Sequence, residues 1–334
     1  MECMCCRSDQ VVWQYDIDSA QAARELASIK DEPTIGKLKD IIEKIWGNKH
    51  AGWYFCRNCK TSFAMPFKAC TTEYYSITYY EDRFYPEWKW DYEVTYRALQ
   101  SIHSNGMQLL EIGAGNGAFV RKVKDSLIEP SNIVCTEFSD YGMGVIQSYG
   151  ITCLPLDINE LVIKENERRF DVICLFQVLE HLDMLDKQFE DFNYLSSSGG
   201  NLFIAVPNHL IRDFYDSLGE HLDWPPGHIS RFSPEGLRIL AEKHGWKLKQ
   251  HIYQPTQRMS QTLQFLDERF KMSKGLSLYK ERIGRRFPQK LFFWGSLFLI
   301  AIRHMNHLIR LNTGKKGTSQ WFWFVNTVSQ MQNS

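Results

Sequence analysis

The chain has 334 residues, enough for one large domain with appendages or for two domains with a substantial buried core. Lysine and arginine together number 39, as do aspartate and glutamate, so the net charge is zero and no overall positive field draws the protein to nucleic acid. The sequence shows no basic stretch followed by an apolar one at its start, which predicts a cytoplasmic protein without a secretory signal. Nine cysteines in that setting favour metal binding and buried thiols over disulfides.

Two C-x-x-C pairs near the N-terminus predict a zinc site. The pairs are Cys3 with Cys6 and Cys56 with Cys59, and four thiolates can surround zinc in a closed tetrahedral site of the structural kind. Zinc binding would add folding free energy to a region with few apolar residues. Cys5 is an alternative to Cys3 as a ligand, and four free thiols are the alternative to any metal site.

The segment between the two pairs is long, and residues 20–46 are predicted to form an inserted pair of helices. Aromatic residues then dominate 74–92. Their rings are predicted either to pack this link onto the rest of the fold or to form a lid over a substrate.

Residues 107–119 contain the most informative motif of the chain. An apolar strand ends in a carboxylate, Glu111, and a turn with three glycines then opens into a helix. Glycines allow backbone N–H groups to approach a ligand closely, and the start of a helix adds a positive field. The motif therefore predicts a turn that binds a ligand.

Two kinds of ligand are compatible with the glycine spacing. Gly113, Gly115 and Ala118 fit the dinucleotide pattern G-x-G-x-x-G/A, and Glu137 follows at the distance of its ribose-binding acid. However, the carboxylate of Glu111 would repel a pyrophosphate, whereas it would attract an ammonium or a sulfonium. The motif therefore favours S-adenosylmethionine over NAD.

Four further strands are predicted after the glycine turn, at 133–137, in the short strand and loop 154–158, at 170–176 and at 199–207. Helix-length segments lie between strands, at 119–127, 141–149 and 184–195. This alternation predicts an α/β fold with a doubly wound parallel sheet and a ligand at the carboxyl ends of its strands. There, Glu137 is predicted to accept hydrogen bonds from two ribose hydroxyls, and Asp157 is predicted to accept one from an adenine amino group.

The motif 111–117, the two later acids and the block Phe-Gln-Val-Leu-Glu-His at 176–181 resemble the class I S-adenosylmethionine-dependent methyltransferases, in particular the ubiquinone-type O-methyltransferase branch. The segment Pro-Pro-Gly-His-Ile-Ser-Arg-Phe-Ser-Pro at 225–234, with the helix expected at 235–244, is typical of the same branch. The resemblance implies a Rossmann-like sheet of seven strands. Its sixth strand is expected at 246–253, and the seventh, at 320–325, is expected to insert antiparallel beside the sixth.

The resemblance also implies which residues bind the cofactor. They lie in the glycine turn and at the ends of the next three strands: Glu111, Gly113, Ala114, Gly115, Gly117, Glu137, Phe138, Asp157, Ile158, Phe176 and Gln177.

The cysteine arrangement resembles the small N-terminal zinc ribbon of bacterial sugar and surface-polysaccharide methyltransferases. This resemblance implies O-methylation of a sugar hydroxyl, on a small-molecule or lipid-linked acceptor, in surface-polysaccharide or glycolipid synthesis. A small aromatic or quinone-type acceptor is the alternative. An NAD-dependent oxidoreductase is a third hypothesis, which Glu111 and the block at 176–181 disfavour.

Two histidines are candidates for the catalytic base, because the acceptor hydroxyl must lose a proton and imidazole titrates near neutral pH. His181 follows the fourth strand, and His228 lies in the loop after the fifth. Each also has a structural interpretation, in which His181 packs the start of a helix and His228 fixes its loop by hydrogen bonds.

The C-terminal region contains a basic cluster at 280–290, an apolar run at 291–302 and an amphipathic stretch at 303–310. The apolar run is well short of the roughly 20 residues that a spanning helix needs. One interpretation is a peripheral helix, with 280–310 on the inner face of an anionic membrane. The alternative is a helix packed on the sheet or across a homodimer.

These features predict four parts of the chain. A zinc-ribbon-like region with a helical insertion covers 1–70, and an aromatic-rich link or lid covers 71–106. The S-adenosylmethionine-binding core covers 107–254. A helical, partly apolar insertion and the final strand cover 255–334.

Overall fold

The computed structural model describes residues 1–26, 31–78, 87–165, 169–211, 223–255 and 316–328. The chain divides into two compact units. The first comprises Met1–Tyr253 and Thr318–Ser334, and the second comprises Gln254–Gly317. Both sheets lie in the first unit, apart from the ends of two strands. The segment 280–310, predicted to contact a membrane, the sheet or a second subunit, lies outside the described residues.

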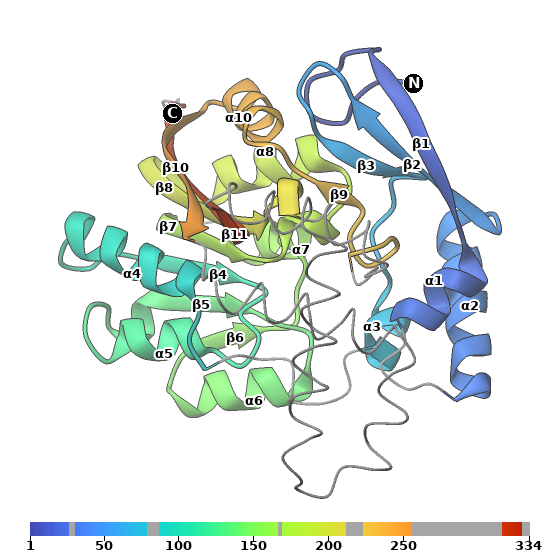
Figure 1. Ribbon diagram of the computed structural model, residues 1–334. Helices are drawn as coiled ribbons and strands as arrows, with labels where there is room; N and C mark the ends of the chain where they lie inside the picture. The colour runs from blue at the N-terminus through green and yellow to red at the C-terminus, as the bar shows by residue number, and fades with distance from the viewer. Residues whose placement is uncertain (27–30, 79–86, 166–168, 212–222, 256–315, 329–334) are drawn as a thin grey trace, which may run out of the picture. The chain divides into compact units, whose positions relative to one another are not determined.

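The larger sheet has seven strands in the order β10-β11-β8-β7-β4-β5-β6 (Figure 1). In chain order these are β4 (Leu109–Ile112), β5 (Ile133–Thr136), β6 (Thr152–Leu154), β7 (Phe170–Phe176), β8 (Ser196–Pro207), β10 (Trp246–Pro255) and β11 (Lys316–Asn326). Strands β4 to β8 pair in parallel, and β11 is antiparallel to β8. The predicted seven-stranded α/β sheet is confirmed, with its last strand inserted beside β10.

The order of the strands places the site. From β4 the chain moves outward to β5 and β6, then returns to the other side of β4 to form β7 and β8. Connections therefore diverge between β4 and β7, and in doubly wound sheets ligands bind at such a point, at the carboxyl ends of the strands. The glycine turn follows β4, and the block at 176–181 follows β7.

Helices cover both faces of this sheet (Figure 1). On one face are α4 (Trp90–Ile102), α5 (Ala118–Lys124) and α6 (Asp140–Ser148), and on the other are α7 (Ile158–Lys164), α8 (Leu185–Leu195) and α10 (Pro234–Lys243). Successive strand residues point to opposite faces, so Leu109 packs with Phe119 in one core layer and Leu110 packs with Phe189 in the other. Burial on both faces explains why these strands are almost continuously apolar.

The N-terminal region forms a second, antiparallel sheet in the order β1-β2-β3-β9. Its strands are β1 (Val11–Asp18), β2 (His50–Cys56), β3 (Ser62–Met65) and the short β9 (Ser230–Arg231), which comes from the distant 225–234 segment. Between β1 and β2 lie α1 (Ser19–Leu26) and α2 (Glu32–Trp46), the helical pair expected at 20–46. The carboxylate of Asp31 caps α2, and Gly47 ends it in the left-handed conformation.

The aromatic-rich segment 71–106 is more regular than a link. It contains α3 (Thr72–Thr78) and most of it after residue 89 is α4. Tyr92, Thr95 and Leu99 of α4 are buried at helical spacing, and Tyr92 and Leu99 pack in the core beside α5. Of the two predicted roles for the aromatic rings, packing is the one that α4 fulfils.

One ion-pair cluster joins the first cysteine pair to the main fold. Asp186 of α8 accepts hydrogen bonds from Arg7, from Lys243 Nζ at 2.8 Å and from His244 Nε2 at 2.9 Å. Burial raises the pKa of Asp186, but these three partners outweigh burial and lower the pKa to about 2. The Asp186 carboxylate therefore stabilises the fold at every pH at which it stays ionised.

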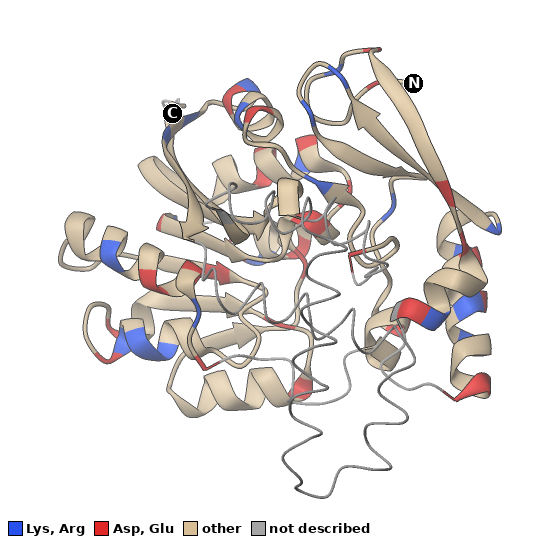
Figure 2. Cartoon of the chain, viewed as in Figure 1, with Lys and Arg blue, Asp and Glu red and all other residues tan. Residues whose placement is uncertain are grey.

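Positive and negative side chains alternate over helices such as α2, α4 and α10 in Figure 2, as the balanced composition leads one to expect. Among the helices that the structure describes, none combines the length and apolar character needed to cross a membrane.

Candidate active site

The glycine turn between β4 and α5 requires its glycines. Gly113, Gly115 and Gly117 have φ values of 67°, 58° and 70°, in the left-handed region that other residues avoid. A Cβ at Gly113 would lie 2.7 Å from Val178, and one at Gly117 would lie 2.5 Å from Ile146. The turn is therefore fixed in shape and closely packed.

Two hydrogen bonds attach this turn to the end of β5. The backbone N–H of Ala114 donates to the carbonyl oxygen of Thr136 at 2.9 Å, and that of Gly113 donates to Thr136 Oγ1 at 3.2 Å. The predicted cofactor residues on the two strands are therefore held together.

Glu111 lies at the carboxyl end of β4 with 1% of its surface exposed. In register it stands between Cys135 of β5 and Cys174 of β7, and its Oε2 atom has no hydrogen-bond partner. Burial raises its pKa well above the ordinary value, and the positive charge of Lys89 opposes that rise. A buried, unpartnered carboxyl oxygen suits a cationic ligand, because such a ligand would compensate the cost of burial.

Glu137 is held against the glycine turn. Its Oε2 accepts from the backbone N–H of Gly115 at 2.8 Å, and its Oε1 accepts from those of Phe138 at 3.0 Å and Ser139 at 2.8 Å. These bonds fix the carboxylate at the end of β5, where the ribose role was predicted, and Phe138 beside it is exposed. That role stays a prediction.

Asp157 has a structural role that the sequence analysis did not assign. It is the N-cap of α7: its Oδ1 accepts from the backbone N–H of Glu160 at 2.8 Å, and the Glu160 side chain accepts from the Asp157 N–H at 3.0 Å. This capping box explains an acid here without a ligand. The neighbouring Ile158 is buried in the core. The contact of Asp157 with adenine and that of Ile158 with the cofactor stay predictions.

The end of β7 is connected to α4 and β11. Gln177 has a left-handed φ of 60°, and its Nε2 donates to Ser319 Oγ at 3.2 Å and to Asp91 Oδ2 at 3.4 Å. Ser319 in turn donates to Asp91 Oδ1 at 2.6 Å. Phe176 packs edge-to-face on Tyr92 with ring centroids 4.9 Å apart. Gln177 is therefore the centre of a polar network whose partners sequence reasoning missed.

Lys89 is a further residue that the sequence did not single out. Its Nζ lies 4.6 Å from the centre of the Tyr92 ring and 5.9 Å from that of Phe176. Burial lowers the pKa of Lys89, whereas the acidic charges of Asp91, Glu111 and Glu180 raise it. A cation thus lies among the buried acids of this site.

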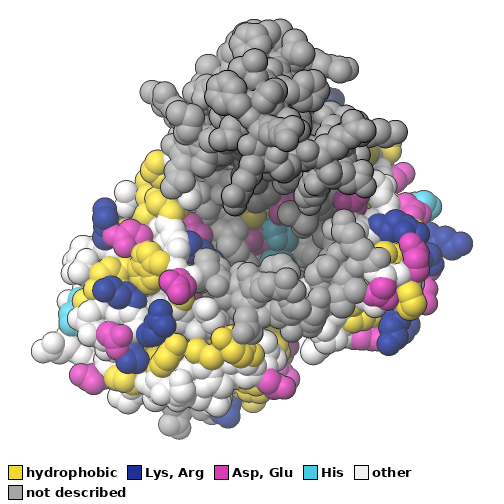
Figure 3. Space-filling view, turned by 60° about the horizontal axis from the view of Figure 1, so that its bottom comes forward, with side chains coloured by type: hydrophobic (Ala, Val, Ile, Leu, Met, Phe, Trp, Pro, Cys, Tyr) yellow, Lys and Arg dark blue, Asp and Glu magenta, His cyan; other side chains and the backbone are white. Residues whose placement is uncertain are grey.

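The two candidate histidines meet. The ring centroids of His181 and His228 are 4.5 Å apart at an interplanar angle of 87°. His181 Nδ1 lies 2.7 Å from the carbonyl oxygen of Gly227, and His228 Nδ1 lies 3.3 Å from Asp223 Oδ1. Figure 3 shows histidine and acidic side chains among the described atoms near the centre of the view. Sequence reasoning found both imidazoles but not Asp223.

Glu180 completes this cluster. It is fully buried, neither carboxyl oxygen has a hydrogen-bond partner, and burial raises its pKa to about 8. One ligand atom each from Glu180, His181 and His228 lies within 4.8 Å of the others, a grouping that could hold a metal ion. Glu180 is the second residue of a Leu-Glu-His run, so its position beside His181 was a signal that the sequence analysis passed over.

The four predicted zinc ligands converge at the N-terminus. Cys3 Sγ lies 3.5 Å from Cys59 Sγ, Cys6 Sγ lies 3.6 Å from Cys56 Sγ, and all four sulfurs lie within 4.8 Å of one another. A tetrahedral zinc site with Zn–S bonds of about 2.3 Å places its sulfurs about 3.8 Å apart. The cluster therefore fits zinc in both ligand type and spacing.

The two cysteine pairs use the same turn. Arg7 N–H donates to the carbonyl oxygen of Cys3 at 3.0 Å, and Lys60 N–H donates to that of Cys56 at 2.9 Å. The backbones of Arg7 and Lys60 both adopt the left-handed conformation, with φ values of 59° and 64°. Cys5 is outside the cluster, with its Sγ 3.2 Å from Met4 Sδ. The four-cysteine cluster therefore contains Cys3 and not Cys5, and the ligand set stays a prediction.

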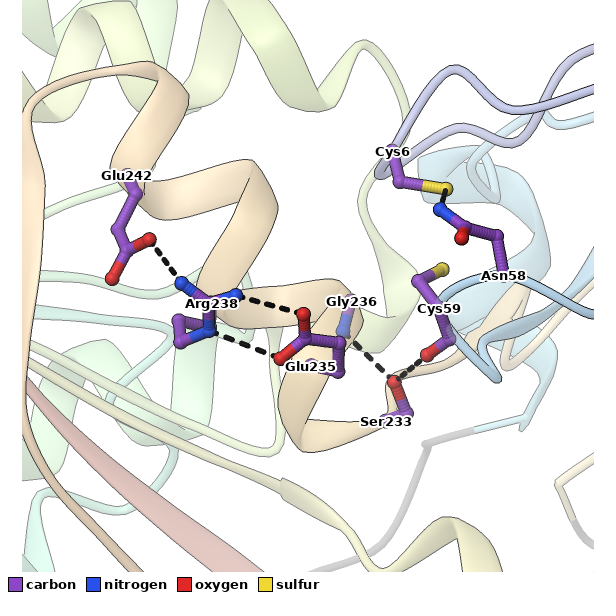
Figure 4. A network of polar contacts seen from close by, with 8 residues as sticks. All are labelled: Cys6, Asn58, Cys59, Ser233, Glu235, Gly236, Arg238 and Glu242. Carbon is purple, nitrogen blue, oxygen red and sulfur yellow. Dashed lines mark hydrogen bonds and ion pairs between the residues drawn. The ribbon is translucent and has the colours of Figure 1, made fainter.

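Cys6 is polarised by its surroundings. Burial raises its pKa, but hydrogen bonds, the largest from Asn58 Nδ2 at 3.5 Å, outweigh burial and lower the pKa to about 7. The pKa values of the Cys3 and Cys59 thiols are raised. The largest cause is a hydrogen bond with another thiol, that of Cys5 for Cys3 and that of Cys3 for Cys59, and burial raises both values further. Figure 4 shows Cys6 and Cys59 with Asn58 on one side of the network that leads to α10.

A mixed seven-stranded sheet with helices on both faces, a glycine turn after β4 and acids at the next strand ends defines an α/β methyltransferase fold. Residues 88–251 match a family model for a methyltransferase domain. This part of the chain is a class I S-adenosylmethionine-dependent methyltransferase domain, and the protein is an S-adenosylmethionine-dependent methyltransferase. The methyltransferase prediction is confirmed over the oxidoreductase hypothesis.

Solved structures of similar fold include three methyltransferases. An S-adenosylmethionine-dependent methyltransferase from Archaeoglobus fulgidus is 14% identical, with 70% of this chain and 94% of that chain covered and a TM-score of 0.44. The magnesium protoporphyrin IX methyltransferase from Synechocystis is 11% identical, with 70% of this chain and 81% of that chain covered and a TM-score of 0.41. An N-methyltransferase from Bradyrhizobium japonicum is 13% identical, with 71% of this chain and 94% of that chain covered and a TM-score of 0.40. No curated protein matches the sequence.

Proposed function

We propose that the protein methylates a hydroxyl of a sugar, on a nucleotide-linked or lipid-linked acceptor, in surface-polysaccharide or glycolipid synthesis. The observation that carries transfer to oxygen is the pair of imidazoles beyond the end of β7, next to the predicted cofactor residues. The sugar is supported by the four-cysteine cluster, the feature that resembles bacterial polysaccharide methyltransferases.

The cofactor half of the site fits S-adenosylmethionine, which supplies an electrophilic methyl group on a sulfonium. Glu111 would accept hydrogen bonds from the ammonium through the oxygen that lacks a partner. Glu137, fixed at the end of β5, would bind the ribose hydroxyls. Phe138, Asp157 and Ile158 would border the adenine. The glycine turn, with Ala114, would let the cofactor approach the backbone, and Phe176 and Gln177 would close the pocket at β7.

His228 is the better candidate for the base. A carbonyl oxygen can only accept, so His181 Nδ1 donates to that of Gly227, and burial lowers the pKa of His181. The Nδ1–H of His181 is thus bound by a neutral carbonyl. His228 instead faces a carboxylate, Asp223, through Nδ1. Its Nε2 would take the proton of the acceptor hydroxyl, and Asp223 would stabilise the imidazolium that forms.

The N-terminal cluster would hold one structural Zn²⁺ through Cys3, Cys6, Cys56 and Cys59. Four thiolates close the coordination sphere of zinc and leave no position for substrate. Zinc there would stabilise the turns of the two cysteine pairs and would take no part in the transfer step.

Methyl-labelled S-adenosylmethionine tests this proposal with the full chain and a panel of nucleotide-linked sugars, lipid-linked sugars, catechols and quinols. We expect label on a sugar hydroxyl. His228→Gln should lower kcat by about 10²-fold with little change in the KM for the cofactor, whereas His103→Gln, at an exposed site after α4, should behave as wild type. Label on catechols or quinols alone would replace the sugar by the aromatic acceptor, and full activity of His228→Gln would remove the assigned base.

A further inference from the structure

The short strand β9 connects the cysteine-rich sheet to the histidine cluster. Ser230 pairs with Phe63 of β3, and Arg231 pairs with Ser62. One residue earlier, the carbonyl oxygen of Ile229 accepts from the N–H of Ala64 at 2.9 Å, while its N–H donates to the carbonyl oxygen of Glu180 at 2.9 Å. The residue that follows His228 is therefore bonded to β3 on one side and to Glu180 on the other.

A second connection runs from Cys59 to the start of α10, as Figure 4 shows. The hydroxyl of Ser233 donates to the carbonyl oxygen of Cys59 and accepts from the N–H of Gly236 at 2.9 Å. The N–H of Ser233 donates to Thr61 Oγ1 at 3.3 Å. Cys59, Thr61 and Ser233, the N-cap of α10, thus form one buried network.

Packing reinforces these hydrogen bonds. The four-cysteine cluster shares a buried core with Phe63, Phe232 and Leu237. The buried guanidinium of Arg231 lies 4.9 Å from the ring of Trp53 on β2. A Cβ at Gly236 would lie 2.0 Å from Thr61 Oγ1, so α10 approaches the second cysteine pair as closely as the backbone allows.

The hydrogen bonds that hold the cofactor half of the site do not run through this network, although β4 packs in the same buried core. The glycine turn and Glu137 are held by bonds to one another and to Thr136, within β4, β5 and the helices around them. Loss of order at the cysteine cluster would therefore reach β9, Ile229 and His228 before it reached the cofactor residues.

We propose that the four-cysteine metal site positions the acceptor side of the active site: bound zinc, through Cys59, Thr61 and Ser233, holds β9 and thereby places His228 beside Glu180. The proposal rests on the assignment of His228 to the acceptor side. Thr61 and Ser233 are positioning residues, because they act through β9 and not on the substrate.

Amide hydrogen exchange of the full chain with zinc bound and after removal by a chelator tests the proposal without an acceptor. Loss of zinc should speed exchange at Ile229, Ser233 and Gly236 by about tenfold or more, while exchange at Ala114 and Glu137 changes by less than about twofold. Calorimetry with S-adenosylhomocysteine should give a similar Kd in both forms.

Thr61→Val provides a second variant, which removes the hydroxyl but keeps all four thiolates. It should keep one zinc and an unchanged Kd for S-adenosylhomocysteine, yet show faster exchange at Ser233 and Gly236. Thr78→Val, which removes a buried hydroxyl from α3, is the matched control and should leave those amides protected.

Two results would overturn the positioning role. One is unchanged exchange at Ile229, Ser233 and Gly236 after zinc removal. The other is an equal rise at these amides and at Ala114, since zinc would then stabilise the fold as a whole. An intact, zinc-bound protein that fails to bind S-adenosylhomocysteine would instead refute the proposed function, whatever the exchange pattern.

Discussion

Replacing Glu180 with glutamine should change how the stability of the protein depends on pH. Burial raises the pKa of this carboxyl from 4.5 to about 8, so the folded state holds a proton that the unfolded chain releases above about pH 4.5. A raised carboxyl pKa makes ionisation costly in the folded state. The buried neutral carboxyl therefore contributes its full stabilisation below pH 4.5, the pKa in the unfolded chain. This contribution to the free energy of unfolding falls as the pH rises toward 8, the pKa in the folded protein.

The size of this effect follows from the two pKa values. Each pKa unit corresponds to about 1.36 kcal/mol, so the free energy of unfolding should fall by at most about 4 kcal/mol between pH 5 and 8.5. Glu180→Gln cannot ionise and should remove most of that fall, leaving the variant more stable than wild type at pH 8.5. At pH 5 the two proteins should be similar.

Urea unfolding at several pH values, with zinc kept constant, measures the effect. Glu190→Gln, at an exposed position of α8, is the control and should follow wild type. The reasoning fails if wild type is equally stable at pH 5 and 8.5, or if Glu180→Gln and wild type lose stability in parallel.

Three further predictions concern the metal, the acid limit of stability and the glycine turn. Cys56→Ser should lower zinc from about one per chain, whereas Cys5→Ser should retain it; equal zinc in both, by metal analysis, would contradict the assigned ligands. Asp186→Asn should abolish about 2 kcal/mol of stability that is present above pH 4 in wild type and lost as the pH falls toward 2, measured by urea unfolding; an unchanged acid transition would count against the ion-pair cluster. Gly142→Ala should weaken S-adenosylhomocysteine binding by about 1–3 kcal/mol, because the new Cβ would lie 2.3 Å from the Gly115 carbonyl oxygen. Gly144→Ala on the same helix has open space and should bind normally.

Much of the fold could be predicted because its signals are local. The apolar strands, the glycine turn and the alternating helices are legible in the sequence, and the structure confirms the sheet that they imply. Helix α4 was harder to predict, because its many aromatic residues also suit a link. The contacts of Tyr92 with Phe119 and Phe176, which come from other parts of the chain, show that this face is core.

The candidate site was partly predictable. Spacing identified the four clustered cysteines, but Cys3 and Cys5 could not be ranked until the turn geometry was known. For Asp157, the capping-box pattern with Glu160 was present in the sequence and was overlooked. The importance of Glu180 depends on its complete burial, which arises from segments far apart in the chain and has no local signature.

Titration calorimetry with S-adenosylhomocysteine tests the central claim most directly. The site formed by Glu111, the glycine turn and Glu137 predicts one binding site per chain. Glu137→Ala should weaken binding by about 1–3 kcal/mol, through loss of two ribose hydrogen bonds and of the support for the Gly115 N–H. Binding of NAD without binding of S-adenosylhomocysteine, or equal affinity of wild type and Glu137→Ala, would contradict the account.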